Sequence, residues 1–140
     1  MPEFGIRSDA NLATCIEDAQ MLANEVVAEV DFCVIEGHRG KIRQNLAFKN
    51  GVSKVQYPNS EHNPFPSHAL DFIPWPFDGS LESWNDTARF KAVADKFKEK
   101  AKAHGISIMC GIDWGWDAGH IQFESKNGVP YPKTFKETEA

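Results

Sequence analysis

The sequence predicts an α+β fold, in which helices pack on one face of a small, mainly antiparallel sheet. Three segments carry apolar residues at the spacing of a helix, and four short apolar runs lie between or after them. The chain has 140 residues, which is the length of one domain. We therefore expect residues 1–140 to form a single domain.

The first predicted helix and strand follow a polar N-terminal segment, residues 1–11. Thr14 and Glu17 have the spacing of a capping box, in which both side chains cover free N–H groups at the start of a helix. Apolar residues then recur at helical spacing, which predicts a helix over about residues 15–29. The short apolar run 32–35 predicts a buried strand.

The middle of the chain predicts a helix, a long loop and a second strand. Residues 41–49 have a helical pattern that ends at Asn50 and Gly51. Residues 52–68 contain three of the eight prolines and predict a loop. The apolar run 69–73 predicts a strand, which a Pro-Trp-Pro sequence closes.

The last third predicts a long helix and two strands after a further loop. Apolar residues recur at helical spacing between Phe90 and Ala101, and Gly105 ends this helix. The apolar runs 106–110 and 121–124 predict strands. The polar residues from about 125 to 140 predict a loosely held tail.

Charge and cysteine content exclude several classes of partner. The chain has 15 Lys and Arg against 20 Asp and Glu, a net charge of −5, which argues against binding to nucleic acid or to anionic lipid. No window has the ~18 apolar residues of a membrane span, and no signal peptide is recognisable, so we expect a cytoplasmic protein without membrane insertion. Cys15, Cys33 and Cys110 are too few and too scattered for a disulfide framework, and we expect three buried or partly buried thiols.

Histidines and acidic residues form one candidate site. His62 lies in the proline-rich loop, and Asp71 lies in an apolar strand, where a carboxylate must be paired, hydrogen-bonded or metal-bound. Asp117 precedes His120 by three positions. Two imidazoles and a carboxylate suit Zn²⁺ with one open position, and Asp117 would then be the proton acceptor. The alternative is a surface histidine with a buried aspartate that backbone N–H groups satisfy, while His104 is expected to end the long helix.

Four sequence blocks between Ser8 and Phe123 resemble the phage-type members of the M15 family of zinc peptidases, in the LAS group. They occur in the family's order and spacing. The blocks are Glu36-Gly37-His38-Arg39 with Gln44; Gly51-Val52-Ser53-Lys54; Ser60-x-His62 with Pro66-Ser67-x-Ala69-x-Asp71; and Gly111-x-Asp113-Trp114 with Asp117-x-x-His120.

The resemblance implies a LAS, or D-Ala-D-Ala peptidase-like, fold and one Zn²⁺ per chain. It assigns His62, Asp71 and His120 as the metal ligands, with water as the fourth ligand, and Asp117 as the base. The interval from His62 to Asp71 is longer than in much of the family, and His68 is the rival ligand. Relatives of the phage branch share this longer interval, so His62 is retained.

Three further residues match family positions that support the site. Arg39 is implied to contact the scissile carbonyl or a substrate carboxylate, for which a guanidinium is suited. Gln44 and Ser60 are implied to support the groups around the metal. Four tryptophans are candidates for the cleft or for the core: Trp75, Trp84, Trp114 and Trp116.

The function that the resemblance implies is hydrolysis of peptide bonds in the stem peptides of bacterial peptidoglycan. The expected protein is a monomeric phage endolysin that collects in the host cytoplasm and reaches the wall after the membrane is permeabilised. An L-Ala–D-Glu endopeptidase is favoured, although a D,D-peptidase also fits the motifs. The alternative from another class is a non-catalytic, zinc-containing module that binds the wall or a protein. Such a module would not need Asp117 and Arg39 beside the ligands.

Overall fold

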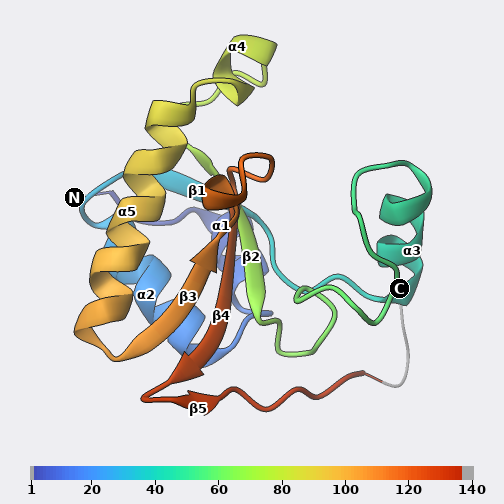
Figure 1. Cartoon of the computed structure of the whole chain (residues 1–140). Coiled ribbons are helices and arrows are strands. Elements are labelled where there is room, and N and C mark those ends of the chain that lie inside the picture. The colour runs from blue at the N-terminus through green and yellow to red at the C-terminus, as the bar shows by residue number, and fades with distance from the viewer. Residues whose placement is uncertain (1, 137–140) are drawn as a thin grey trace.

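The computed structural model describes residues 2–136 and contains one antiparallel sheet with helices on both sides (Figure 1). Its strand order is β1-β2-β4-β3, and β5 pairs with β4. This arrangement confirms the predicted α+β class. The strands are β1 (Phe32–Glu36), β2 (Ala69–Pro74), β3 (Ile106–Cys110), β4 (His120–Lys126) and β5 (Val129–Pro130).

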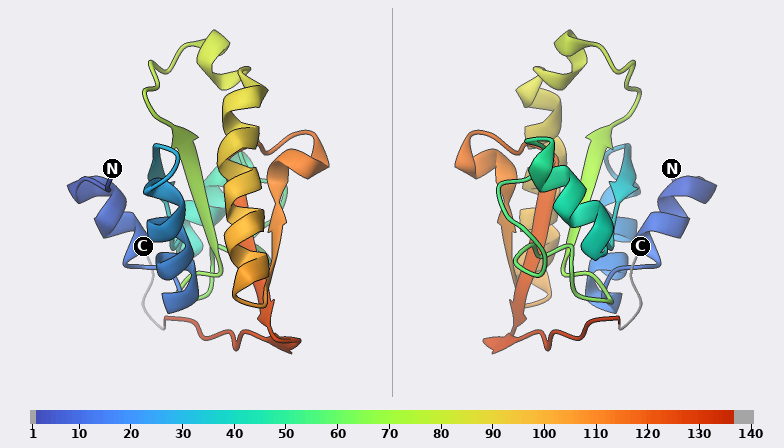
Figure 2. Two further views of the ribbon diagram at one scale, coloured as in Figure 1. Left: turned by 90° about the vertical axis from the view of Figure 1, so that its left-hand side faces the viewer. Right: turned by 90° about the vertical axis from the view of Figure 1, so that its right-hand side faces the viewer.

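Two helices cover one face of the sheet. Figure 2 shows α2 (Glu17–Val27) and α5 (Thr87–Ala103) on that side, and α3 (Lys41–Lys49) on the other. The apolar stripe of each covering helix is buried against the sheet. Phe32 on β1 has edge-on contacts to Phe72 on β2 and to Phe97 on α5, with ring centres 5.7 and 5.6 Å apart. Burial of these side chains is the main source of stability.

The central strands place apolar side chains on one face of the sheet and polar side chains on the other. Because side chains alternate along a strand, Leu70 and Phe72 of β2 enter the core and Asp71 lies on the opposite face. In β4, Ile121 and Phe123 enter the core in the same way. The strand register pairs Asp71 with His120 and Glu36 with Asp71. The side chains of Glu36, Asp71 and His120 therefore stand in one row across β1, β2 and β4.

Most predicted elements occur at the predicted residues. The helix 41–49 and the strand 106–110 have the predicted ends, whereas the first predicted helix is shorter and begins at Glu17. The predicted capping box is wrong. The Thr14 hydroxyl donates to the carbonyl of Asn11 and accepts from the N–H of His38, so it joins two loops instead of capping α2.

Two short α-helices, and the 3-10 helix η1 (Gly111–Trp114), were not predicted. Helix α1 (Ile6–Leu12) replaces most of the expected N-terminal segment and lies against β1. The Ser8 hydroxyl accepts from Val34 N–H, and Asn11 donates to the carbonyl of Val34, so α1 covers the edge of the sheet with polar groups and has little apolar pattern. Helix α4 (Leu81–Trp84) lies in the expected loop and is capped by Ser80.

The C-terminal segment differs from the expected loose tail. Residues 125–136 complete β4, form β5 and continue along the body of the protein. The Tyr131 hydroxyl donates to Asp18 at 2.8 Å, and Phe65 N–H donates to the carbonyl of Thr134 at 2.7 Å. The part of the predicted tail at residues 137–140 lies outside the described residues.

Two smaller expectations are also tested by the described part of the chain. The three thiols are free, with Cys15 and Cys110 buried and Cys33 partly buried, as expected. Burial raises the pKa of the Cys15 thiol to about 12 and that of Cys110 to about 11. Within residues 2–136, no helix combines the length and the apolar character needed to cross a bilayer.

Candidate active site

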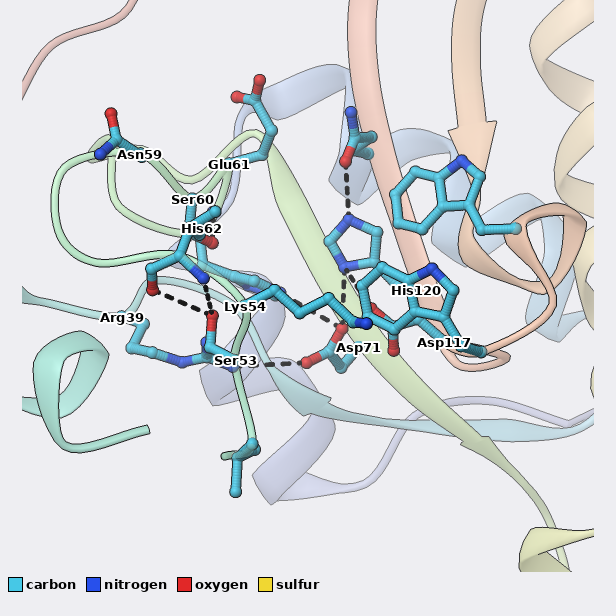
Figure 3. Close-up of a pocket in the computed structure, with 15 residues that line it drawn as sticks. Arg39, Ser53, Lys54, Asn59, Ser60, Glu61, His62, Asp71, Asp117 and His120 are labelled. Carbon is cyan, nitrogen blue, oxygen red and sulfur yellow. Dashed lines mark hydrogen bonds and ion pairs between the residues drawn. The ribbon is translucent and has the colours of Figure 1, made fainter. Parts of the chain in front are cut away.

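The face of the sheet opposite the core carries a cavity of about 390 Å³ (Figure 3). The long loop between α3 and β2 forms one wall, and the turn that carries Trp114, Trp116 and Asp117 forms the other. A second cavity of about 420 Å³ has a more apolar lining and shares five residues with the first: Arg39, Val52, Asp71, Trp116 and Asp117. The two cavities therefore meet at the predicted catalytic residues.

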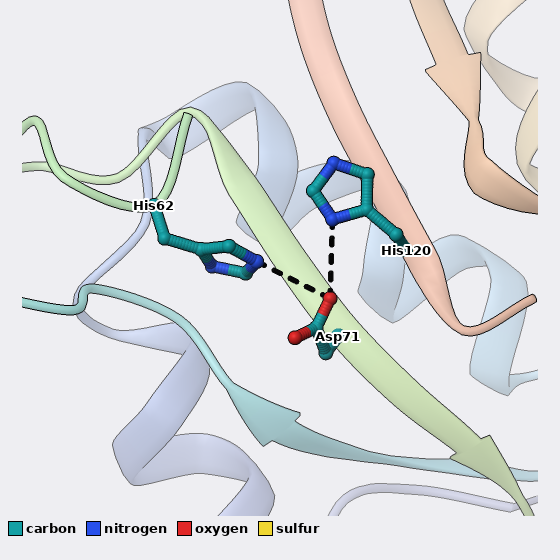
Figure 4. Close-up of side chains that lie close together, drawn as sticks. All are labelled: His62, Asp71 and His120. Atoms are coloured by element: carbon teal, nitrogen blue, oxygen red, sulfur yellow. Dashed lines mark hydrogen bonds and ion pairs between the residues drawn. The ribbon is translucent and has the colours of Figure 1, made fainter. Parts of the chain in front are cut away.

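Three of the predicted site residues meet inside the first cavity. His62 comes from the long loop, Asp71 from β2 and His120 from the start of β4 (Figure 4). Their ligand atoms all lie within 4.8 Å of one another. His62 Nε2 and His120 Nδ1 are each 3.2 Å from the same oxygen, Asp71 Oδ1.

The outer nitrogen of each imidazole faces a fixed acceptor. His62 Nδ1 donates to the carbonyl of Gly37 at 2.7 Å, and His120 Nε2 donates to Gln122 Oε1 at 2.8 Å. The Gln122 amide is itself oriented, because its nitrogen donates to Glu124 Oε1 at 2.6 Å. Neutral rings held in this way turn their lone pairs toward Asp71.

This arrangement fits a divalent metal ion. Lone pairs of two neutral imidazoles and an oxygen of Asp71 converge with no proton between them, which is repulsive unless a cation lies at the meeting point. Burial opposes ionisation of Asp71, but His62 and His120 outweigh burial and hold the pKa of its carboxyl far below the usual value. Without a cation, a proton on His120 Nδ1 takes its place: burial opposes this protonation, but the hydrogen bond that Nδ1 then donates to Asp71 outweighs the effect of burial and raises the pKa of His120.

Asp117 stands beside the cluster, as expected for a base. Its Oδ2 lies 3.8 Å from His120 Nδ1, and the side chain is partly exposed to the cavity. Burial is the largest influence on Asp117 and raises the pKa of its carboxyl, with a further contribution from the charge of Asp71. A carboxyl group with a raised pKa is suited to accept a proton and to pass it on.

Arg39 is held next to Asp71 by a second carboxylate. Its Nε donates to Glu36 Oε1 at 2.7 Å, and its Nη2 is 3.6 Å from Asp71 Oδ2. Arg43 also pairs with Glu36. Since Glu36 is the cross-strand neighbour of Asp71, the sheet itself fixes the guanidinium at the cavity.

Gln44 and Ser60, the two predicted supporting residues, hold the loop that carries His62. Gln44 is fully buried, and its Oε1 accepts from Arg39 Nη1 and from Asn63 Nδ2, each at 3.1 Å. The Ser60 hydroxyl accepts from His62 N–H at 3.2 Å. The arginine, the glutamine and the histidine loop are thus one connected hydrogen-bonded unit.

Close packing explains two glycines of the sequence blocks. A Cβ at Gly37 would collide with the Thr14 hydroxyl and the carbonyl of Asn11, and one at Gly111 would collide with the backbone of Asp117. Gly37 supplies the carbonyl that orients His62, so its backbone must approach closely. These glycines place groups of the site without themselves bearing functional side chains.

Other candidates lie outside the cluster. His68 Nε2 donates to the carbonyl of Pro132 at 3.1 Å, and the structure does not group this histidine with the three ligand atoms. His104 ends α5 and pairs with Glu25. Trp114 lines the first cavity, Trp84 lines the second and Trp116 lines both, whereas Trp75 lines neither of the two.

Two residues near the ligands were missed by sequence reasoning. Gln122 orients His120, and Asn63 joins Gln44 to the carbonyl of Arg39 at 2.9 Å. The only signal for Gln122 was a polar residue on the outward face of a predicted strand, two positions after His120. Asn63 offered no pattern beyond its place next to His62.

Comparison with known proteins finds similarity over most of the chain. A family model described as phage L-alanyl-D-glutamate peptidase matches residues 2–130. The crystal structure of the L-Ala D-Glu endopeptidase ChiX from Serratia marcescens has a similar fold, with a TM-score of 0.69 and 24% sequence identity over 86% of this chain and 88% of that chain. A comparison with curated protein sequences finds no match.

Proposed function

Because the chain belongs to the phage L-alanyl-D-glutamate peptidase family, we propose that it cleaves the L-Ala–D-Glu bond of peptidoglycan with one zinc ion held by His62, Asp71 and His120. The observation that carries this proposal is the meeting of the three ligand atoms within 4.8 Å. Family membership makes the chain a peptidase and contradicts the alternative of a non-catalytic module.

The donor set is one that suits zinc. Two imidazoles and one carboxylate with an open position form a common catalytic zinc site, and the outer nitrogens of both histidines are already hydrogen-bonded. A zinc ion held by these residues would lower the pKa of a bound water to about 7 and would polarise a carbonyl group.

The remaining residues have roles that follow from their positions. Asp117, at the junction of the two cavities, takes the proton from the attacking water and delivers it to the nitrogen of the leaving D-Glu. Arg39, fixed by Glu36 and Gln44, stabilises negative charge that develops on the carbonyl oxygen of L-Ala. Gln44 holds Arg39 in position and Ser60 holds the backbone of His62 in position, each through a hydrogen bond.

The biological setting proposed here is that of a phage endolysin. The peptidase is made in the host cytoplasm and reaches the wall after the membrane is permeabilised. It acts as a monomer, with peptidoglycan as its partner. Membership of the phage peptidase family supports this setting.

Purified peptidoglycan is the substrate that tests the proposal. We expect about one zinc per chain by elemental analysis, and new C-terminal L-Ala and N-terminal D-Glu ends by mass spectrometry. A chelator should stop the reaction, and added zinc should restore it. Cleavage at a D-Ala–D-Ala bond, or full activity without metal, would contradict the proposal.

A further inference from the structure

Lys54 is a cationic residue of the first cavity to which nothing above gives a role. It lies in the long loop between α3 and β2, and buried Gln44 holds its two neighbours in the sequence. Gln44 Nε2 donates to Ser53 Oγ at 2.8 Å and to the carbonyl of Val55 at 2.7 Å. The backbone at Lys54 is therefore fixed relative to Arg39, which donates to the same glutamine.

The Lys54 side chain reaches across the cavity toward its opposite wall (Figure 3). Its ammonium lies 4.6 Å from the centre of the Trp116 ring. Trp116 stacks on Trp114 with centres 5.6 Å apart, and Trp114 lies 5.3 Å from the His120 ring. The aromatic wall thus holds the ammonium close to the proposed metal ligands.

Lys54 and Arg39, the two cations of this cavity, differ in their partners. Arg39 is bound by Glu36 and Gln44. Across residues 2–136, by contrast, no carboxylate forms an ion pair with Lys54, and its recorded contact is the exposed ring of Trp116. A cation–π contact at an exposed position is weak, so a carboxylate would bind the ammonium more strongly.

The proposed substrate brings a carboxylate to this place. A D-glutamyl residue has one amine and two carboxyl groups. Its amine is joined to L-Ala and one carboxyl is joined to the next residue, so the second carboxylate stays free. When the chain continues through the side-chain carboxyl, the free group is on the α-carbon, next to the nitrogen of the scissile bond. It must therefore lie within a few bonds of the reacting carbonyl, in the cavity that Lys54 lines.

We propose that Lys54 binds the free carboxylate of the glutamyl residue on the leaving-group side, and so makes the enzyme prefer glutamate over its amide there. The inference rests on the proposed function and adds a residue that determines specificity. Charge pairing in the cavity strengthens substrate binding, while Trp116 keeps the ammonium in position before the substrate arrives.

Two synthetic peptides test this role. Both have L-Ala followed by a D-glutamyl residue that continues through its side chain to Lys, one with a free α-carboxylate and one with an α-carboxamide. The unmodified enzyme should cleave the acid with a kcat/KM about 10- to 100-fold higher, mainly through KM. Lys54→Gln should lose this factor on the acid and change little on the amide. Lys49→Gln, which removes an exposed lysine outside both cavities, is the matched control.

A binding measurement keeps the two proposals distinguishable. Calorimetry on chelator-treated protein should show tighter binding of the acid peptide, and Lys54→Gln should abolish the difference. Equal losses on both peptides, or no loss at all, would overturn the role of Lys54. Failure of the unmodified protein to cleave either peptide would contradict the proposed function, and calorimetry would then still decide whether Lys54 binds the carboxylate.

Discussion

The two faces of the central sheet are held together in different ways. On the face covered by α2 and α5, apolar side chains such as Leu22 and Phe97 are completely buried. On the opposite face, Gln44 is the buried residue of α3, while Ile42 and Leu46 of the same helix are 63% and 54% exposed. The first face is a hydrophobic core, and the second is a hydrogen-bonded frame around polar groups.

The difference separates the source of stability from the source of activity. Burial of apolar area supplies most of the free energy of folding, and it needs no particular chemistry from Leu22 or Phe97. The frame around His62, Arg39 and Gln44 supplies fixed geometry, which catalysis requires. Substitutions on one face should therefore change stability, and substitutions on the other should change activity.

Loss of a metal ligand should have the largest effect. His120→Ala removes one of the three proposed ligand groups, so zinc content should fall to near zero and cleavage of peptidoglycan should be abolished. Circular dichroism of the metal-free proteins should remain alike, because the core is unchanged. His68→Ala is the control and should keep its zinc; if this variant alone loses zinc, the choice of His62 as a ligand is wrong.

Loss of the proposed base should leave the metal in place and slow the reaction. Asp117→Asn keeps the shape of the side chain and removes its ability to accept a proton, so kcat should fall by about 10²–10⁴. Zinc content and melting temperature should change little. A variant that lyses walls at the original rate would exclude Asp117 as the base. Glu124, already bound to Gln122, and Asp113, paired with Lys98, would be the next acids to test.

A substitution in the core should give the reverse pattern. Leu22→Ala removes a completely buried side chain from α2 and should lower the free energy of unfolding by about 2–5 kcal/mol, measured by urea denaturation. The rate per folded molecule should stay the same at low temperature, because α2 lies on the far face from the cavity. A lower rate per folded molecule would show that the two faces are coupled.

The smallest effect is expected on the outer side of α3. Leu46→Ser replaces an exposed apolar residue and should change the free energy of unfolding by less than about 0.5 kcal/mol. Denaturation at several protein concentrations is the measurement. A large, concentration-dependent loss would mean that α3 is covered by a second copy in solution, which would contradict the proposed monomer.

The same contrast explains what the sequence could predict about the fold. Elements that bury an apolar stripe or run, such as α5 and β3, were predicted because burial leaves a periodic pattern. Helix α1 and strand β5 were missed because hydrogen bonds and polar contacts hold them, and these leave no period. Helix α3 was predicted correctly, but from apolar residues that are exposed in the structure. The pattern that predicted it therefore does not reflect how the helix packs.

The site was predicted mainly from the four sequence blocks that resemble a known family, and less from the positions of single histidines and acidic residues. The sequence blocks identified five candidate site residues, and all five line one cavity of the structure: His62, Asp71, His120, Asp117 and Arg39. The residues that orient them were harder to find. A single buried amide such as that of Asn63, or a backbone carbonyl, acts through three-dimensional contacts that no linear pattern records.

The position of β4 in the sheet has a consequence for how the protein is made. Translation proceeds from the N-terminus, and β4, which lies between β2 and β3, is among the last segments to be synthesised. His120 stands at its first position. A nascent chain on the ribosome contains His62 and Asp71 once residue 71 has been added, and it lacks the third proposed ligand group until residue 120 is made. With His120 as a zinc ligand, as proposed, the peptidase is expected to become active only when β4 has taken its place between β2 and β3.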